Sequence, residues 1–258
     1  MHNMYNLGLK LFSVNTDMLQ PAAVLLAEGV FSYVELYSPP QTYAATVNTW
    51  KSLSCPWVIH APHFGNGVNL ADPLLKKANA AALQDSRRFA DALNTPHIIV
   101  HGGFGGNLEE VCQQIADLQD GRFILENTPQ YGTGGQLCVG YTPEHIKLAM
   151  NSGAFAGFVL DMGHAVYAAN ALNEGALSFL KRFLQFNPCM MHIADGVWNE
   201  TKDVHHRIGQ GDFELAAMCA LLPSQARLTL EIPRDATRQL QDAKEDALVL
   251  RRLFLAVP

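Results

Sequence analysis

The chain has 258 residues, of which 48% are hydrophobic and 16% are charged, and its formal net charge is −6 at pH 7. This balance is typical of a globular protein with a sizeable core, and it excludes a disordered chain and a coiled coil. The acidic excess gives no global attraction to nucleic acid or to anionic lipid. No apolar run approaches the roughly 20 residues of a membrane span, so we expect no membrane partner.

The N-terminal segment 1–12 lacks a basic leader, and its apolar stretch is too short for a signal peptide. The five cysteines are scattered and form no CxxC pair. We therefore predict reduced thiols in a cytoplasmic protein.

Short apolar runs recur along the chain, each followed by a polar loop and a helical pattern. The runs predict strands over residues 7–12, 33–37, 57–62, 97–103, 123–128, 157–163, 189–195 and 228–233. Apolar spacing near 3.6 residues predicts helices between them, with examples at 74–93, 109–119, 176–186 and 239–256. Thr142, Pro143 and Glu144 indicate another helix start, with a capping residue, a proline and an acidic first turn.

Strict alternation of strands and helices predicts parallel strands with helical crossovers. Eight such units in 258 residues favour one closed (β/α)8 barrel, a single domain over residues 1–258. An open, doubly wound α/β sheet is the alternative, but no GxGxxG motif follows the first predicted strand.

Six predicted strands end in a histidine or a carboxylate. These residues are His60, His101, Glu126, Asp161, His192 and Glu231, on the third to eighth strands. Each alone could be a buried polar group with a partner, or a helix cap. At one barrel mouth, however, they would repel one another or stay unpaired unless a cation lay among them. The sequence therefore predicts a divalent metal centre with nitrogen and oxygen ligands.

Three more residues extend this set. His164 lies three residues after Asp161, and the alternation of an extended segment puts Asp203 and His205 on one side. Nine side chains are too many for one ion, so we predict up to three divalent ions, zinc in the first place and manganese as the alternative. The set contains no cysteine, which argues against a structural zinc knot.

In order along the chain, these motifs resemble the endonuclease IV family of apurinic endonucleases, within the xylose-isomerase-like barrel superfamily. The similar segments lie within residues 55–233 and read HAP (60–62), HGG (101–103), LENT (125–128), DMGH (161–164), MHIAD (191–195), DVHHRIGQG (203–211) and LEI (230–232). The resemblance implies metal-assisted hydrolysis of a phosphodiester, with Glu126, Asp161 and Glu231 as catalytic carboxylates.

The same resemblance implies how the ligands divide among the ions. One ion would take His60, His101 and Glu126, and a second would share Glu126 and add Asp161, His192 and Glu231. A third would take His164, Asp203 and His205, where His205 is preferred to the adjacent His206.

The residues that would hold the substrate differ from the nuclease pattern. His63 stands where that family has a DNA-contacting tyrosine, and we expect substrate contacts from His63, Gly102, Gly103, Lys202 and Arg207. Only Lys202, Arg207 and Arg234 lie in loops at the expected catalytic face. A duplex-binding groove usually draws on more phosphate contacts, so a small phosphodiester or sugar-type substrate is a rival to abasic DNA.

A sugar isomerase or epimerase is the second hypothesis. It needs one ion on Glu126, Asp161, His192 and Glu231, with Glu126 and Glu231 exchanging a proton across the bound sugar. Glu35, in the second predicted strand, resembles this branch of the superfamily. The hypothesis leaves the other ligands without a necessary role. A non-enzymatic binding module would not require nine ligands.

Overall fold

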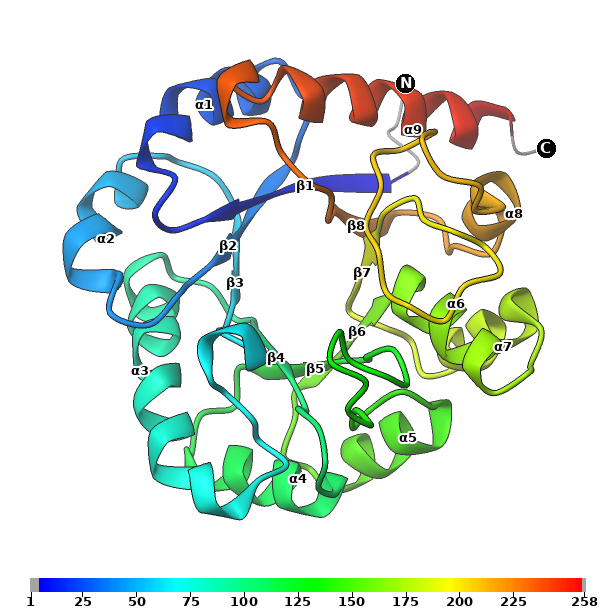
Figure 1. Ribbon diagram of the computed structural model, residues 1–258. Coiled ribbons are helices and arrows are strands. Elements are labelled where there is room, and N and C mark those ends of the chain that lie inside the picture. The colour runs from blue at the N-terminus through cyan, green and yellow to red at the C-terminus, as the bar shows by residue number, and fades with distance from the viewer. Residues whose placement is uncertain (1–4, 257–258) are drawn as a thin grey trace.

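The computed structural model describes residues 5–256, and its eight strands form a closed parallel barrel in the order β1 to β8. The strands are β1 (Tyr5–Phe12), β2 (Tyr33–Tyr37), β3 (Trp57–His60), β4 (Ile98–His101), β5 (Phe123–Glu126), β6 (Gly157–Asp161), β7 (Met190–Ile193) and β8 (Ala226–Leu230). They make an inner ring, and the helices surround it (Figure 1). The (β/α)8 prediction is confirmed. Residues 1–4, part of the segment considered as a signal peptide, lie outside the described residues.

The outer ring consists of helices that follow the strands in turn. They are α1 (Leu19–Ala27), α2 (Tyr43–Lys51), α3 (Lys76–Ala92), α4 (Leu108–Asp117), α5 (Pro143–Asn151), α6 (Met162–Ala171), α7 (Ala176–Leu184), α8 (Leu215–Ala220) and α9 (Gln241–Ala256). The predicted start of α5 is confirmed, because the Thr142 side chain accepts a hydrogen bond from the backbone N–H of His145. None of the helices described within residues 5–256 is long and apolar enough to cross a membrane.

The two-residue period of the strands places the polar groups at the barrel mouth. On β5, Phe123 and Leu125 pack outward against the helices, whereas Ile124 belongs to a small apolar cluster inside the barrel. Glu126, two residues after Ile124, therefore also points into the barrel, nearer to its carboxyl-terminal mouth. The same relation links the inward-facing Val58, Ile99, Val159 and Met190 to His60, His101, Asp161 and His192.

Several strands end earlier than the sequence predicts. β4 ends at His101, and two residues later Gly103 has a φ of +94°, which takes the chain out of the extended conformation. A Cβ on Gly103 would also lie 2.0 Å from Asn69 Oδ1, so the turn requires glycine. β8 ends at Leu230, which makes Glu231 the first residue of the following loop.

Helix α9 begins beside α1 and closes the ring (Figure 1), and near the two ends of the described chain the Tyr5 and Phe254 rings stack with centroids 4.2 Å apart. Lys244 Nζ lies 2.7 Å from Glu28 Oε2, and an Arg251 Nη2–H donates to the carbonyl oxygen of Gly29 at 2.6 Å. Helix α9 also binds the loop that carries part of the site, through Asp246 and Glu245.

Candidate metal centre

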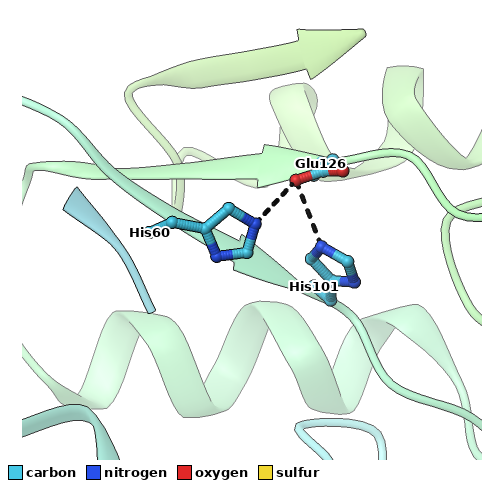
Figure 2. A group of neighbouring side chains, drawn as sticks. All are labelled: His60, His101 and Glu126. Carbon is cyan, nitrogen blue, oxygen red and sulfur yellow. Dashed lines mark hydrogen bonds and ion pairs between the residues drawn. The ribbon is translucent and has the colours of Figure 1, made fainter. Parts of the chain in front are cut away.

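The predicted ligands gather at the carboxyl-terminal mouth of the barrel, around the buried Glu126. His60 Nε2 and His101 Nε2 lie 3.2 and 3.1 Å from Glu126 Oε2, and both rings face that carboxylate (Figure 2). His192 Nδ1 lies 3.3 Å from the other oxygen, Oε1. Glu126 is therefore placed to be shared between two sites.

Three groups of side chains have ligand atoms within 4.8 Å of one another. They are His60, His101 and Glu126; then Glu126, Asp161, His192 and Glu231; and then Asp161, His164 and His205. The last group is joined by Asp203, whose carboxylate oxygens lie 3.4 Å from His164 Nε2 and 3.3 Å from His205 Nε2. The structure thus brings together all nine side chains that the sequence singled out as ligands.

Three of the histidines are oriented by a backbone acceptor on the far side of the ring. His60 Nδ1 is 2.8 Å from the carbonyl oxygen of Ala61, and His164 Nδ1 is 2.8 Å from that of Asn127. His205 Nδ1 is 2.6 Å from the carbonyl oxygen of Glu231. When the N–H points to these acceptors, each Nε2 presents a lone pair to the carboxylates, as metal-ligating imidazoles do.

His192 has the opposite orientation, because its far-side partner is a carboxylate from β2. Its Nε2 lies 2.8 Å from Glu35 Oε2, and its Nδ1 lies 2.6 Å from Glu231 Oε2. An imidazole N–H held by a second carboxylate is the arrangement that fixes a ligand's tautomer and raises its basicity. Glu35, which the sequence marked only as resembling the isomerase branch, therefore orients a predicted ligand.

Some neighbouring ligand atoms are close together without forming hydrogen bonds. In the described part of the chain, His101 Nε2, Asp203 Oδ1 and Glu231 Oε2 are buried and have no hydrogen-bond partner, although each has a carboxylate oxygen or an imidazole nitrogen within 3.3 Å. These nitrogen and oxygen atoms converge as the ligands of a divalent cation would.

Burial and mutual charge shift the protonation of these residues. Burial opposes the protonation of His192, but the carboxylates of Glu35, Glu126 and Glu231 outweigh it and raise its pKa well above the usual value. Burial also opposes the protonation of His205, but Asp203, Glu231 and Asp161 together outweigh it and raise its pKa to about 9. Without metal, therefore, protons take the place of cations at these ligands.

Near the rim, burial and the neighbouring His101 lower the pKa of His63 to about 3, so that its ring is neutral at pH 7.

Asp195 fixes the loop that carries Asp203 and His205. Its carboxylate accepts hydrogen bonds from the backbone N–H groups of Gly196, Gly209, Gly211 and Phe213, at 2.8–3.1 Å. A Cβ on Gly211 would lie 2.2 Å from the carbonyl oxygen of Gly196, which explains the glycine at this position. The backbone of His206 pairs with that of Asp195, whereas the side chain of its neighbour His205 faces the ligand cluster.

A cavity of about 520 Å³ opens above the ligands. Its floor includes Lys10, His101, His164, Asp203, His205 and Glu231. Its walls are largely apolar, with Phe12, Phe64, Phe104, Pro129, Ile232 and Pro233 among them. The cavity therefore combines a charged floor with walls suited to the non-polar part of a small molecule.

Only some of the residues predicted to bind substrate line this cavity. His63 and Gly103 line the cavity, whereas Gly102, Lys202 and Arg207 are not among its lining residues in the described chain. Gly102 is buried, and a Cβ there would lie 2.8 Å from the carbonyl oxygen of Val139. Lys202 is exposed.

Arg207 points away from the cavity, toward α9. Its Nε–H lies 3.2 and 3.1 Å from the two carboxylate oxygens of Asp246, and its Nη2 is 2.9 Å from Glu245 Oε2. The guanidinium therefore anchors the loop that bears His205.

Sequence reasoning missed one charged residue of the site, Lys10 on β1. Its Nζ lies 2.6 Å from Glu231 Oε1 and 3.2 Å from Glu35 Oε1, and the residue lines the cavity. A lysine within an apolar strand gave no local signal. Pairing of Lys10 with Glu35 across parallel strands at the barrel mouth was the only available hint.

Solved structures share this fold at low sequence identity. Endonuclease IV from Thermus thermophilus superposes with a TM-score of 0.69 at 20% identity, covering 96% of this chain and 99% of that one. A D-tagatose 3-epimerase-like protein gives 0.67 at 18%, covering 95% and 98%. The 3-keto-D-glucoside 4-epimerase of E. coli gives 0.66 at 13%, covering 96% and 99%.

No curated protein is similar enough in sequence to count as a match. The model of the family described as xylose isomerase-like TIM barrel matches residues 31–253, most of the chain. A closed eight-stranded barrel with buried His, Asp and Glu clusters at its mouth agrees with that match. The chain therefore belongs to the xylose isomerase-like TIM barrel family.

Proposed function

We propose that the protein is a metal-dependent phosphoesterase that hydrolyses a small phosphodiester at a centre of up to three divalent ions, zinc or manganese. One observation carries this proposal: two further ligand groups flank the central group of Glu126, Asp161, His192 and Glu231 and share Glu126 and Asp161 with it. A one-ion enzyme needs only the central group. The flanking histidines would then have no necessary role.

Divalent ions at such a centre supply an acidified water and positive charge for a phosphoryl group. The chain's own residues prepare this chemistry. Glu126 faces imidazoles of both the first and the central group, while His63 offers a neutral ring at the cavity rim. The apolar walls exclude water and accept the organic part of the substrate.

The distribution of basic side chains favours a small substrate over duplex DNA. Arg207 is bound to Asp246 and Glu245, and Arg234 lies 3.8 Å from Asp246. Affinity for a duplex comes largely from several phosphates contacted by free lysines and arginines. The cavity instead encloses about 520 Å³, which suits a drug-sized or smaller molecule.

A sugar isomerase or epimerase is the second candidate, and one observation favours it. Glu126 and Glu231 belong to the same four-residue group, and Glu231 lines the cavity. In that case the two carboxylates would exchange a proton with a sugar bound between them.

The test compares the two reactions in the same preparations. Protein loaded with zinc or with manganese is assayed with bis(p-nitrophenyl) phosphate and, separately, with a panel of ketoses. The proposal expects phosphodiester hydrolysis that is lost on chelation and in a His60→Ala variant. Ketose epimerisation that survives the His60→Ala substitution, without hydrolysis, would favour the second candidate.

A further inference from the structure

Lys10 introduces a fixed positive charge into the predicted metal centre. Its side chain is only 10% exposed, and it stands between carboxylates from both neighbouring elements of the barrel. On one side, Glu35 is its register partner on β2. On the other side, Glu231 follows β8, which pairs with β1 and closes the barrel.

Charge balance with Glu35 alone does not explain this position. Glu35 is fully buried and needs a counter-charge, because a buried carboxylate without one is costly. The closer contact of Lys10, however, is with Glu231, at 2.6 Å against 3.2 Å for Glu35. Lys10 and Glu231 both line the cavity, whereas Glu35 does not.

The ammonium group has a donor to spare. It carries three N–H groups, and in the described part of the chain Glu35 and Glu231 are its two ion-pair partners. We propose that Lys10 is a substrate-binding residue whose remaining N–H donates to an anionic oxygen of a phosphoryl group in the cavity. The inference rests on the proposed function for its substrate class and deepens it.

A charged donor of this kind favours anionic ligands over neutral ones. An ammonium beside Glu231 attracts an oxyanion and gains less from a neutral hydroxyl, because charge-assisted hydrogen bonds are the stronger ones. Lys202 and Arg207 lie outside the cavity lining, so within the described chain Lys10 and Arg234 are the lysine and arginine that can contact a ligand in the cavity.

The experiment measures binding of inorganic phosphate to zinc-loaded protein by calorimetry, with metal content determined on the same samples. Removal of Lys10 alone would leave the buried Glu35 with His192 but without its ammonium partner, so the test variant is the double substitution Lys10→Met with Glu35→Gln. Its matched control is Glu35→Gln alone, and Lys147→Met, on the exposed face of α5, controls for the loss of a lysine.

We expect the double variant to bind phosphate about 10- to 100-fold more weakly than Glu35→Gln, with the same metal content. Equal affinities would overturn the proposal and leave Lys10 as a counter-charge only. No phosphate binding by the wild type would overturn it too, as would loss of metal from the double variant, which would assign Lys10 to holding Glu231. Lys10-dependent phosphate binding without phosphodiesterase activity would keep this inference and reject the proposed reaction.

Discussion

Replacing Glu126 with glutamine tests whether this carboxylate is shared between two ions. Glu126 lies within 3.3 Å of nitrogen atoms on His60, His101 and His192, and it is the only carboxylate in the group with His60 and His101. At about 4 Å and an effective dielectric constant near 20, one unit charge interacts with another by about 4 kcal/mol. An amide removes this attraction while it keeps the size of the side chain.

We therefore expect Glu126→Gln to weaken binding at the first site by up to roughly a thousandfold and to abolish activity with the fold retained. The central group keeps Asp161, His192 and Glu231 and should still bind an ion. Calorimetric titration with zinc, with circular dichroism to check folding, measures both effects. Glu200→Gln, an exposed position in the loop after β7, is the control. Unchanged stoichiometry and affinity in Glu126→Gln would refute the shared-ligand reasoning.

Three further predictions follow from the same geometry. The pKa values of His164, His192 and His205 are raised, to about 9 for His205, so metal binding must displace protons and metal affinity should increase as the pH rises toward 9. Isothermal titration in buffers of different ionisation enthalpy would detect the released protons. A pH-independent metal affinity would contradict the prediction. Replacing Arg207 with methionine leaves Asp246, which is 2% exposed, without its closest partner. We expect this substitution to lower the free energy of unfolding by about 3 kcal/mol, which corresponds to a melting temperature lower by roughly 6–12 °C in a thermal scan. An unchanged melting temperature would show that this anchor is dispensable. Binding to an abasic-site duplex should be weak and strongly salt-dependent, and tight binding with efficient incision at moderate salt would reject the small-substrate argument.

The sequence predicts the barrel and its ligand set because both depend on local patterns. An inward apolar residue such as Ile124, followed two positions later by Glu126, places the carboxylate at the mouth of any parallel barrel. His205 could be preferred to His206 by its spacing from Asp203 and by resemblance. The structure adds the hydrogen bond between His205 Nδ1 and the carbonyl oxygen of Glu231, which turns Nε2 of His205 toward the cluster.

The charge partners could not be predicted, because they depend on long-range contacts. Arg207 was expected to contact substrate, yet its partners lie on α9, almost forty residues further along the chain. Lys10 lies in an apolar strand, and only closure of the barrel brings Glu231 beside it. Asp195 closes the MHIAD motif, and only the structure shows it holding the backbone of the ligand-bearing loop, through N–H groups fourteen to eighteen residues further along the chain.

The number of divalent ions bound per chain tests the central claim most directly. Elemental analysis of the zinc-saturated wild type, beside His60→Ala and the Glu200→Gln control, is the measurement. We predict more than one ion in the wild type and in the control, and one ion fewer in His60→Ala. A single ion in all three proteins would contradict the multinuclear centre and favour isomerisation at Glu126, Asp161, His192 and Glu231.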